Sequence, residues 1–509
     1  MIPPARELPQ HRFLSDNTPL RPLSMRAHLT RVRCRSPRFV LILAFLSIGW
    51  SPYAAAQLPA AELFAGRSVD FSHGPLRISE QGRRVVHADG TPFFWLGDTA
   101  WELFHRLDRE EAEHYLEDRR SKGFNVIQAV VLAELDGLSV PNPYGHTPLI
   151  DNDPSRPDES YFRHVDFIVD RAAVKGMYIG MLPTWGDKFN RKWGVGPEIF
   201  TVENARVYGA FLGRRYRDRP IIWILGGDRS PESETHLAII RAMAEGIREG
   251  DGGAHLMTYH PMGGNASSAW FHHDRWLDLN MFQSGHGERD GANYEMTSRD
   301  YLRVPVKPVL DGEPRYEDHP VNWRPEEGWF EEFDVRQAAY WSLLSGAAGH
   351  TYGDHNIWQM WEPGRNPISS ARTPWREALH HPGSRQMGFA RRLFESRPFL
   401  LLEPDTAALV DAGEGPGHQV AGRGRDGSYL FAYTPLGRPL TLRMNRITGP
   451  TARAHWFDPR TGNAEDAGSF PTSGERRFSP PGAEGRGSDW ILVLDREASD
   501  VGRPGIPAP

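Results

Sequence analysis

Short apolar runs alternate with amphipathic stretches between Phe93 and Phe394, and eight such runs can be counted. Runs that end in turn residues and are separated by helical patterns are typical of parallel β/α units. The expected strands are residues 93–97, 126–132, 178–182, 221–225, 255–259, 279–282, 306–310 and 350–352. The expected helices are residues 109–122, 161–175, 202–215, 232–247, 335–344 and 375–394. The pattern predicts an α/β fold, a (β/α)8 TIM barrel at residues 74–398, with a hairpin at 76–87 ahead of the first strand.

After Ser396 the pattern changes to short β-like runs separated by Gly/Pro-rich turns. Such spacing favours an antiparallel β-sandwich, which we expect at residues 399–498. We expect this C-terminal domain to share a hydrophobic interface with the barrel, and residues 499–509 to form a disordered tail.

The first 56 residues are typical of a signal peptide with an upstream extension. Several arginines precede an apolar run at residues 39–50, and Ala54-Ala55-Ala56 follows it. The run is shorter than the roughly 20 residues of a membrane-spanning helix. We therefore expect cleavage after Ala56, a linker at residues 57–73, and a secreted or periplasmic protein without a membrane anchor. Met25, just ahead of the basic region, is the expected true start.

Composition excludes several partners and chemistries. The chain of 509 residues has 1 Cys, Cys34, which would leave with the signal, so disulfides and thiolate chemistry are excluded for the mature protein. Loss of 8 Arg and 2 acidic residues leaves 51 basic and 63 acidic side chains, a formal charge of −12. That charge disfavours nucleic acid and anionic membranes as partners. The 16 Trp favour a carbohydrate ligand, and we expect no metal and no cofactor.

Candidate active-site residues lie where the expected strands end, because βα-barrel enzymes place their sites there. Glycoside hydrolysis needs two carboxyl groups, and Asp228 and Glu313 end the fourth and seventh strands, on opposing sides of the barrel. We predict these two as catalytic. The predicted substrate-binding residues at the other strand ends are Asp98, Trp101, Glu134, Trp185, His260, Gln283, His286, Asp354 and Trp358.

Each of these assignments has a structural alternative. Asp228 could cap the helix that follows Ser230-Pro231-Glu232, and Glu313 could form an ion pair with Arg315. Asp98 could likewise cap the end of the first strand. Trp223 lies in mid-strand and is expected in the core.

Three motifs resemble the apiosidase-like glycoside hydrolase family: the run from Phe93 to Trp101, the strand that ends in Gly226-Gly227-Asp228, and the turn Asp311-Gly312-Glu313-Pro314. The segment after the barrel is similar to the collagen-binding domain that follows such barrels. The resemblance implies a hydrolase of pectic side chains, with terminal apiose as one substrate, and it implies Asp228 and Glu313 as the catalytic carboxylates. By analogy with retaining barrels, Asp228 would be the acid/base and Glu313 the nucleophile. The sequence departs from that pattern at Gly227, where an Asn is usual.

Two other functions compete with this interpretation. His260, His286 and Asp354 occupy positions that metal-dependent amidohydrolase barrels use for metal, although the His-x-His of such enzymes is missing from the first strand. A non-catalytic glycan-binding protein is the second alternative. The sequence leaves open the sugar, the linkage and the oligomeric state.

Overall fold

The computed structural model describes residues 63–499 and 501–506. The predicted signal peptide, its cleavage site and the first part of the linker lie outside the described residues. Within the described part of the chain, no helix is long and apolar enough to cross a membrane.

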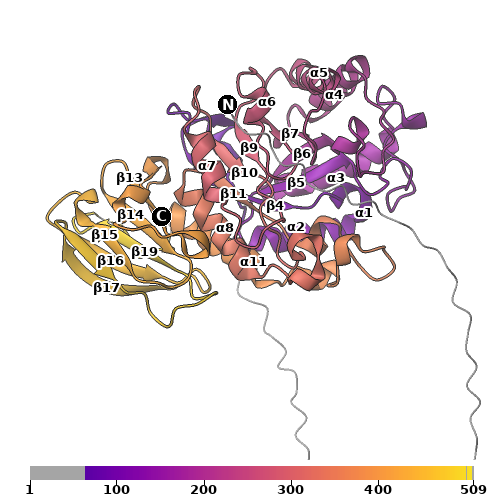
Figure 1. Cartoon of the computed structure of the whole chain (residues 1–509). Helices are drawn as coiled ribbons and strands as arrows, with labels where there is room; N and C mark the ends of the chain where they lie inside the picture. The colour runs from indigo at the N-terminus through magenta and orange to yellow at the C-terminus, as the bar shows by residue number, and fades with distance from the viewer. Residues whose placement is uncertain (1–62, 500, 507–509) are drawn as a thin grey trace, which may run out of the picture. The chain divides into compact units, whose positions relative to one another are not determined.

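Eight parallel strands form the wall of a barrel (Figure 1). Six pair in the order β11-β4-β5-β6-β7-β8, and β9 pairs with β10. Backbone hydrogen bonds join the two groups of strands. The N–H of Asp278, just ahead of β9, donates to Met257 of β8, and the N–H of Ala348, just ahead of β11, donates to Val309 of β10, both at 2.8 Å. The predicted barrel is thereby confirmed. The strands are β4 (Trp95–Thr99), β5 (Val126–Leu132), β6 (Tyr178–Thr184), β7 (Ile221–Gly226), β8 (Met257–His260), β9 (Asn280–Phe282), β10 (Val309–Asp311) and β11 (Gly349–Tyr352).

Helices surround these strands. Five of the expected helices are found within a few residues of their predicted limits, whereas the helices Leu103–Arg106, Ser268–Phe271, Asn293–Tyr301 and His355–Trp358 were not predicted. The helix expected at 375–394 is two helices, because Pro382 has no backbone N–H to continue the first one and instead begins the second. The helices are α1 (Leu103–Arg106), α2 (Arg109–Ser121), α3 (Glu159–Val174), α4 (Val202–Tyr216), α5 (Glu234–Asp251), α6 (Ser268–Phe271), α7 (Asn293–Tyr301), α8 (Glu332–Leu344), α9 (His355–Trp358), α10 (Trp375–Ala378) and α11 (Pro382–Glu395).

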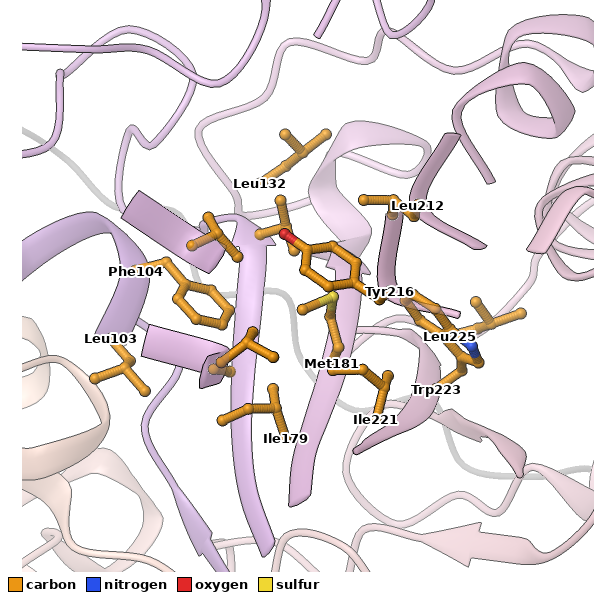
Figure 2. Close-up of a cluster of buried hydrophobic side chains, with 14 of the residues drawn as sticks. Leu103, Phe104, Leu132, Ile179, Met181, Leu212, Tyr216, Ile221, Trp223 and Leu225 are labelled. Atoms are coloured by element: carbon orange, nitrogen blue, oxygen red, sulfur yellow. The ribbon is translucent and has the colours of Figure 1, made fainter. Parts of the chain in front are cut away.

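Alternate residues of the strands fill two different cores. On β7, Ile222 and Ile224 belong to the cluster inside the barrel, whereas Ile221 and Trp223 pack against the helices. Figure 2 shows this outer core, with Trp223 beside Tyr216 of α4. Because both faces are covered, the barrel strands are buried along their whole length, as expected for a parallel sheet. Trp223 is a core residue, as predicted.

The segment ahead of the first barrel strand forms the predicted hairpin. β1 (Leu76–Ile78) pairs antiparallel with β2 (Val85–His87), which pairs with the short β3 (Pro92–Phe93). Gly82 in the connection has φ 70°, a conformation that glycine adopts without strain.

The C-terminal domain is antiparallel. One sheet has the order β12-β13-β14-β19-β16-β17, and β15 pairs with β18. Apolar residues of both sheets, such as Leu430, Leu442 and Leu492, form one cluster between them. The strands are β12 (Leu402–Pro404), β13 (Val420–Gly424), β14 (Tyr429–Thr434), β15 (Leu440–Arg443), β16 (Thr451–Phe457), β17 (Ala464–Pro471), β18 (Glu475–Phe478) and β19 (Trp490–Arg496).

The barrel and the C-terminal domain share a core, as predicted. Tyr340 of α8 and Phe394 of α11 belong to the same buried cluster as Phe431 of β14 and Val493 of β19. A buried ion pair crosses the same boundary, between Arg336 of α8 and Asp489, with an Nη2–Oδ1 distance of 2.7 Å.

The end of the chain corrects one expectation. Residues 503–506 were expected to be disordered, but Pro504 and Gly505 are buried. The Gly505 N–H lies 3.3 Å from Ser396 Oγ, and Gly505 packs so closely on Phe457 that a Cβ would meet the ring at 2.7 Å. Pro504 and Gly505 are packed against the protein, and a Gly/Pro-rich composition alone does not distinguish such a packed segment from a disordered one.

Candidate active site

A sharp turn after β7 presents Asp228. Gly226, Gly227 and Asp228 have φ values of 94°, 103° and 53°, so three consecutive residues are left-handed. A Cβ at Gly227 would lie 2.9 Å from Trp185 Cα, so this turn has room only for glycine. For Asp228 this conformation is strained, and such strain is found at functional sites.

Asp228 does not cap a helix, since the N-cap of α5 is Ser233. The Arg229 guanidinium instead donates to the backbone oxygen of Asp228 at 2.8 Å and lies 3.3 Å from its Oδ2. The Asp228 side chain remains 20% exposed at the mouth of the barrel. The capping alternative is therefore wrong.

The turn after β10 fixes Glu313. The carbonyl of Gly312 accepts a hydrogen bond from Gln128 of β5 at 2.9 Å, and a Cβ at Gly312 would lie 2.5 Å from Met281 Sδ. Arg315 donates to Gln337 at 3.0 Å and to the backbone of Arg289, so the alternative role of Glu313, an ion pair with Arg315, is wrong.

Two histidines hold the Glu313 carboxylate. Nε2 of His286 lies 3.0 Å from Oε1, and Nε2 of His260 lies 3.0 Å from Oε2. Nδ1 of His260 accepts the backbone N–H of Asp228 at 3.1 Å, so its proton resides on Nε2, toward Glu313. His260 thus connects the loops of both carboxylates. The structure brings together four of the predicted residues: Asp228, His260, His286 and Glu313.

The environments of the two carboxyl groups shift their pKa values in opposite directions. Burial, followed by the negative charge of Glu313, raises the pKa of Asp228 from 3.8 to about 7. Burial also acts to raise the pKa of Glu313, but the close contacts with the His260 and His286 rings outweigh it and lower that pKa from 4.5 to about 2. Such a pair has one group that can give a proton at neutral pH and one that is always ionised.

Gln283 and Glu134 lie beside Asp228. The Gln283 side chain hydrogen-bonds to the Asp228 carboxylate, whose charged form it stabilises. Burial, followed by the charge of Asp228, raises the pKa of Glu134 to about 8. A protonated Glu134 can donate a hydrogen bond to a sugar hydroxyl, which agrees with its predicted place in the substrate site.

Two predicted substrate ligands are structural residues. The Asp98 carboxylate is fully buried and accepts from Tyr115 at 2.6 Å and from Arg119 at 2.5 Å, both on α2, so it points out of the barrel. The Asp354 carboxylate caps α9 and lies 2.5 Å from Nδ1 of His381. Both assignments are corrected, because each carboxylate is already bound by protein groups.

The predicted tryptophans are buried. Trp101, Trp185 and Trp358 are 2%, 3% and 8% exposed and belong to the core inside the barrel. Trp101 and Trp185 nevertheless contact His260, at ring-centroid distances of 5.4 and 6.2 Å. Trp101 and Trp185 form the floor of the site beneath the carboxylates. None of the three tryptophans offers the open indole face expected of a stacking platform.

Sequence reasoning missed three residues of the site: Arg229, Tyr316 and His319. Arg229 directly follows Asp228, and its position next to a catalytic candidate was the available signal. The His286 ring stacks on His319 with centroids 4.3 Å apart and contacts Tyr316 at 4.4 Å. Tyr316 and His319 follow Glu313 in the chain, but only the folded loop brings them to His286.

The residues considered for a metal site do not converge. His260 and His286 bind Glu313, whereas Asp354 is bound to His381. Among the residues that the structure describes, no group of three or more His, Cys, Asp or Glu side chains is arranged to hold a metal ion.

The fold and the opposed carboxylates define a barrel hydrolase with two acidic groups. A family model described as "Apiosidase-like, catalytic domain" matches residues 79–401, so the chain belongs to the apiosidase-like family and is a glycoside hydrolase. Residues 404–495 match a second model, "Putative collagen-binding domain of a collagenase". No curated protein matches the chain.

Two solved structures are similar over both domains. One, a glycoside hydrolase, is 36% identical with a TM-score of 0.79, and the match covers 85% of this chain and 99% of that one. The other, a glycoside hydrolase family 5 protein from Bacteroides vulgatus, is 34% identical with a TM-score of 0.79, covering 85% and 96%. The likeness extends through nearly the whole length of both relatives.

Proposed function

We propose that this glycoside hydrolase is a secreted enzyme that removes a sugar, terminal apiose being the first candidate, from pectic side chains with retention of configuration. The family supports the substrate class, and the signal-like N-terminal sequence supports secretion. The observation that carries the mechanism is the opposite shift of the two carboxyl pKa values.

In the first step, Asp228 gives its proton to the glycosidic oxygen while a Glu313 oxygen attacks the anomeric carbon. The carbon–oxygen bond breaks, the aglycone leaves as an alcohol, and a glycosyl ester forms on Glu313. The two histidines keep Glu313 ionised and oriented for this attack. Arg229 and Gln283 hold the Asp228 side chain in place.

In the second step, the Asp228 carboxylate accepts a proton from water, and the resulting hydroxide attacks the anomeric carbon. The ester bond breaks and Glu313 is again a carboxylate. The high pKa of Asp228 suits both steps, since the group must release a proton and then recover it near neutral pH.

The test is release of monosaccharide from pectic, arabinan, xylan and gellan-type polysaccharides by the wild type and by Glu313→Gln and Asp228→Asn. Release by the wild type alone is expected. The configuration of the first sugar formed, followed by NMR, reports the mechanism: an inverted product would refute the nucleophilic role of Glu313. Full activity of both variants would refute the site itself.

A further inference from the structure

Trp193 and Trp323 are the two large aromatic side chains most open to solvent among the described residues, with exposures of 57% and 53%. Both stand in loops that follow barrel strands, Trp193 after β6 and Trp323 after β10. Exposure of a whole indole costs hydrophobic free energy, so two such residues at the catalytic end of a barrel need an explanation.

Trp193 is joined to Asp228 through Arg229. The guanidinium carbon of Arg229 lies 4.0 Å from the centre of the Trp193 ring, and the same guanidinium binds the Asp228 backbone. Arg229 is fully buried and covers part of the indole, and Lys192 Nζ lies 5.6 Å from the ring centre, yet 57% of the Trp193 side chain stays exposed. The supporting loop is anchored by Asp187, which accepts the N–H of Gly196 at 2.8 Å.

Trp323 is joined to Glu313 through His286. Its ring meets His286 edge to face, with centroids 6.0 Å apart, and His286 binds the Glu313 carboxylate. The backbone here is strained, since Asn322 and Trp323 have φ values of 54° and 59°. The N–H of Asn322 donates to the carbonyl of His286 at 2.8 Å, which ties this turn to the histidine loop. A left-handed Trp is a costly conformation that the fold maintains in order to present the side chain.

We propose that Trp193 and Trp323 are two carbohydrate-stacking platforms, one on the Asp228 side and one on the Glu313 side of the scissile bond. The C–H face of a sugar ring is apolar and complements the electron-rich face of an indole. The inference rests on the proposed function and extends it: the enzyme grips sugars on both sides of the bond, so its substrate is an oligosaccharide or a side chain still attached to its polymer.

The test compares Trp193→Ala, Trp323→Ala and the two Trp→Phe variants with a matched control, Leu302→Ala. Leu302 is 75% exposed but lies between α7 and β10, at the end of the barrel opposite the catalytic loops. Binding is measured on the Glu313→Gln background by retardation in gels that contain each of the four polysaccharides. Hydrolysis of the polysaccharide that is cleaved is measured with the same variants in the enzyme that retains Glu313.

Each Trp→Ala change is expected to weaken binding and raise KM about tenfold, equivalent to about 1.4 kcal/mol, with a smaller effect on kcat. Phe should restore part of the loss and Leu302→Ala should have no effect. Wild-type binding and KM in both Trp→Ala variants, in an enzyme that Glu313→Gln inactivates, would overturn the platforms and leave the proposed function standing. If no polysaccharide retards the Glu313→Gln protein and the wild type cleaves none, both are overturned.

Discussion

Replacing Asp228 with Asn should abolish hydrolysis and yet stabilise the protein, by an amount that grows with pH. In the folded state the pKa of Asp228 is about 7, against an ordinary value of 3.8. The folded protein therefore holds this proton more tightly than the unfolded chain, and stability is lost as the pH rises from about 4 to 7. An amide cannot ionise, so the variant escapes that loss.

The magnitude follows from the two pKa values. Each pKa unit corresponds to about 1.4 kcal/mol, so the raised pKa lowers the folding stability by about 2 kcal/mol at pH 5, where only the unfolded chain ionises this group, and by about 4 kcal/mol above pH 7. The gain of the variant should then rise by about 2 to 3 kcal/mol between pH 5 and pH 8. Asn tolerates the left-handed backbone at this position as well as Asp does, so the substitution adds little strain.

The assay is urea unfolding of both proteins at pH 5, 6, 7 and 8, followed by tryptophan fluorescence. Glu313→Gln is the matched comparison and has the opposite sign. The pKa of Glu313 is lowered from 4.5 to about 2, so its charge contributes stability above about pH 4.5 that is lost as the pH falls toward 2. At pH 6 this variant should be destabilised by about 3 kcal/mol. An Asp228→Asn difference that stays constant from pH 5 to 8 would refute the reasoning.

Three further outcomes are expected. The wild-type kcat/KM should be level between the pKa values of Glu313 and Asp228, about 2 and about 7, and fall about tenfold per pH unit above about pH 7, as Asp228 loses its proton; a profile still level at pH 9 would exclude Asp228 as the acid. His286→Phe removes one of the hydrogen bonds that lower the pKa of Glu313, so the acidic limb of the same profile should move to higher pH, and an unmoved limb would contradict that role. Arg336→Ala leaves the buried Asp489 carboxylate without its partner and should cost about 3 to 5 kcal/mol in urea unfolding, whereas replacing both residues with apolar ones should cost much less.

The strands and the positions of Asp228 and Glu313 at strand ends could be predicted from the sequence because both follow from a local pattern. The run at 126–132 has the same limits as β5, and the turns Gly226-Gly227-Asp228 and Asp311-Gly312-Glu313 lie at strand ends as expected. The substrate-binding assignment of Asp98 was wrong because the two-residue period of a strand does not tell which of its faces lies inside the barrel. Residues of β4 alternate between the barrel interior, where Trp95 lies, and the helices, and Asp98 falls on the helix side.

The tryptophans show a second limit of sequence reasoning. Trp101 and Trp185 lie just after strands and Trp358 ends α9, after β11; all three were expected to be open, but the inner core covers them. Trp193 and Trp323 are open because their loops turn through left-handed residues, including Lys192 with φ 43°. Contacts to Asp187 and His286 fix those turns. Because these contacts form only when the loops fold, no local sequence preference predicts the exposure of the two tryptophans.

The core shared by the barrel and the C-terminal domain limits how this enzyme can be shortened or recombined. Cutting the chain after Leu401 would expose the faces of α8 and α11 that now contact Phe431 and Val493, and a barrel with that much bare apolar surface would aggregate. The C-terminal sheet is therefore no detachable accessory. Exchanging it between enzymes would require the facing helix residues to move with it, so the two regions must change together during evolution.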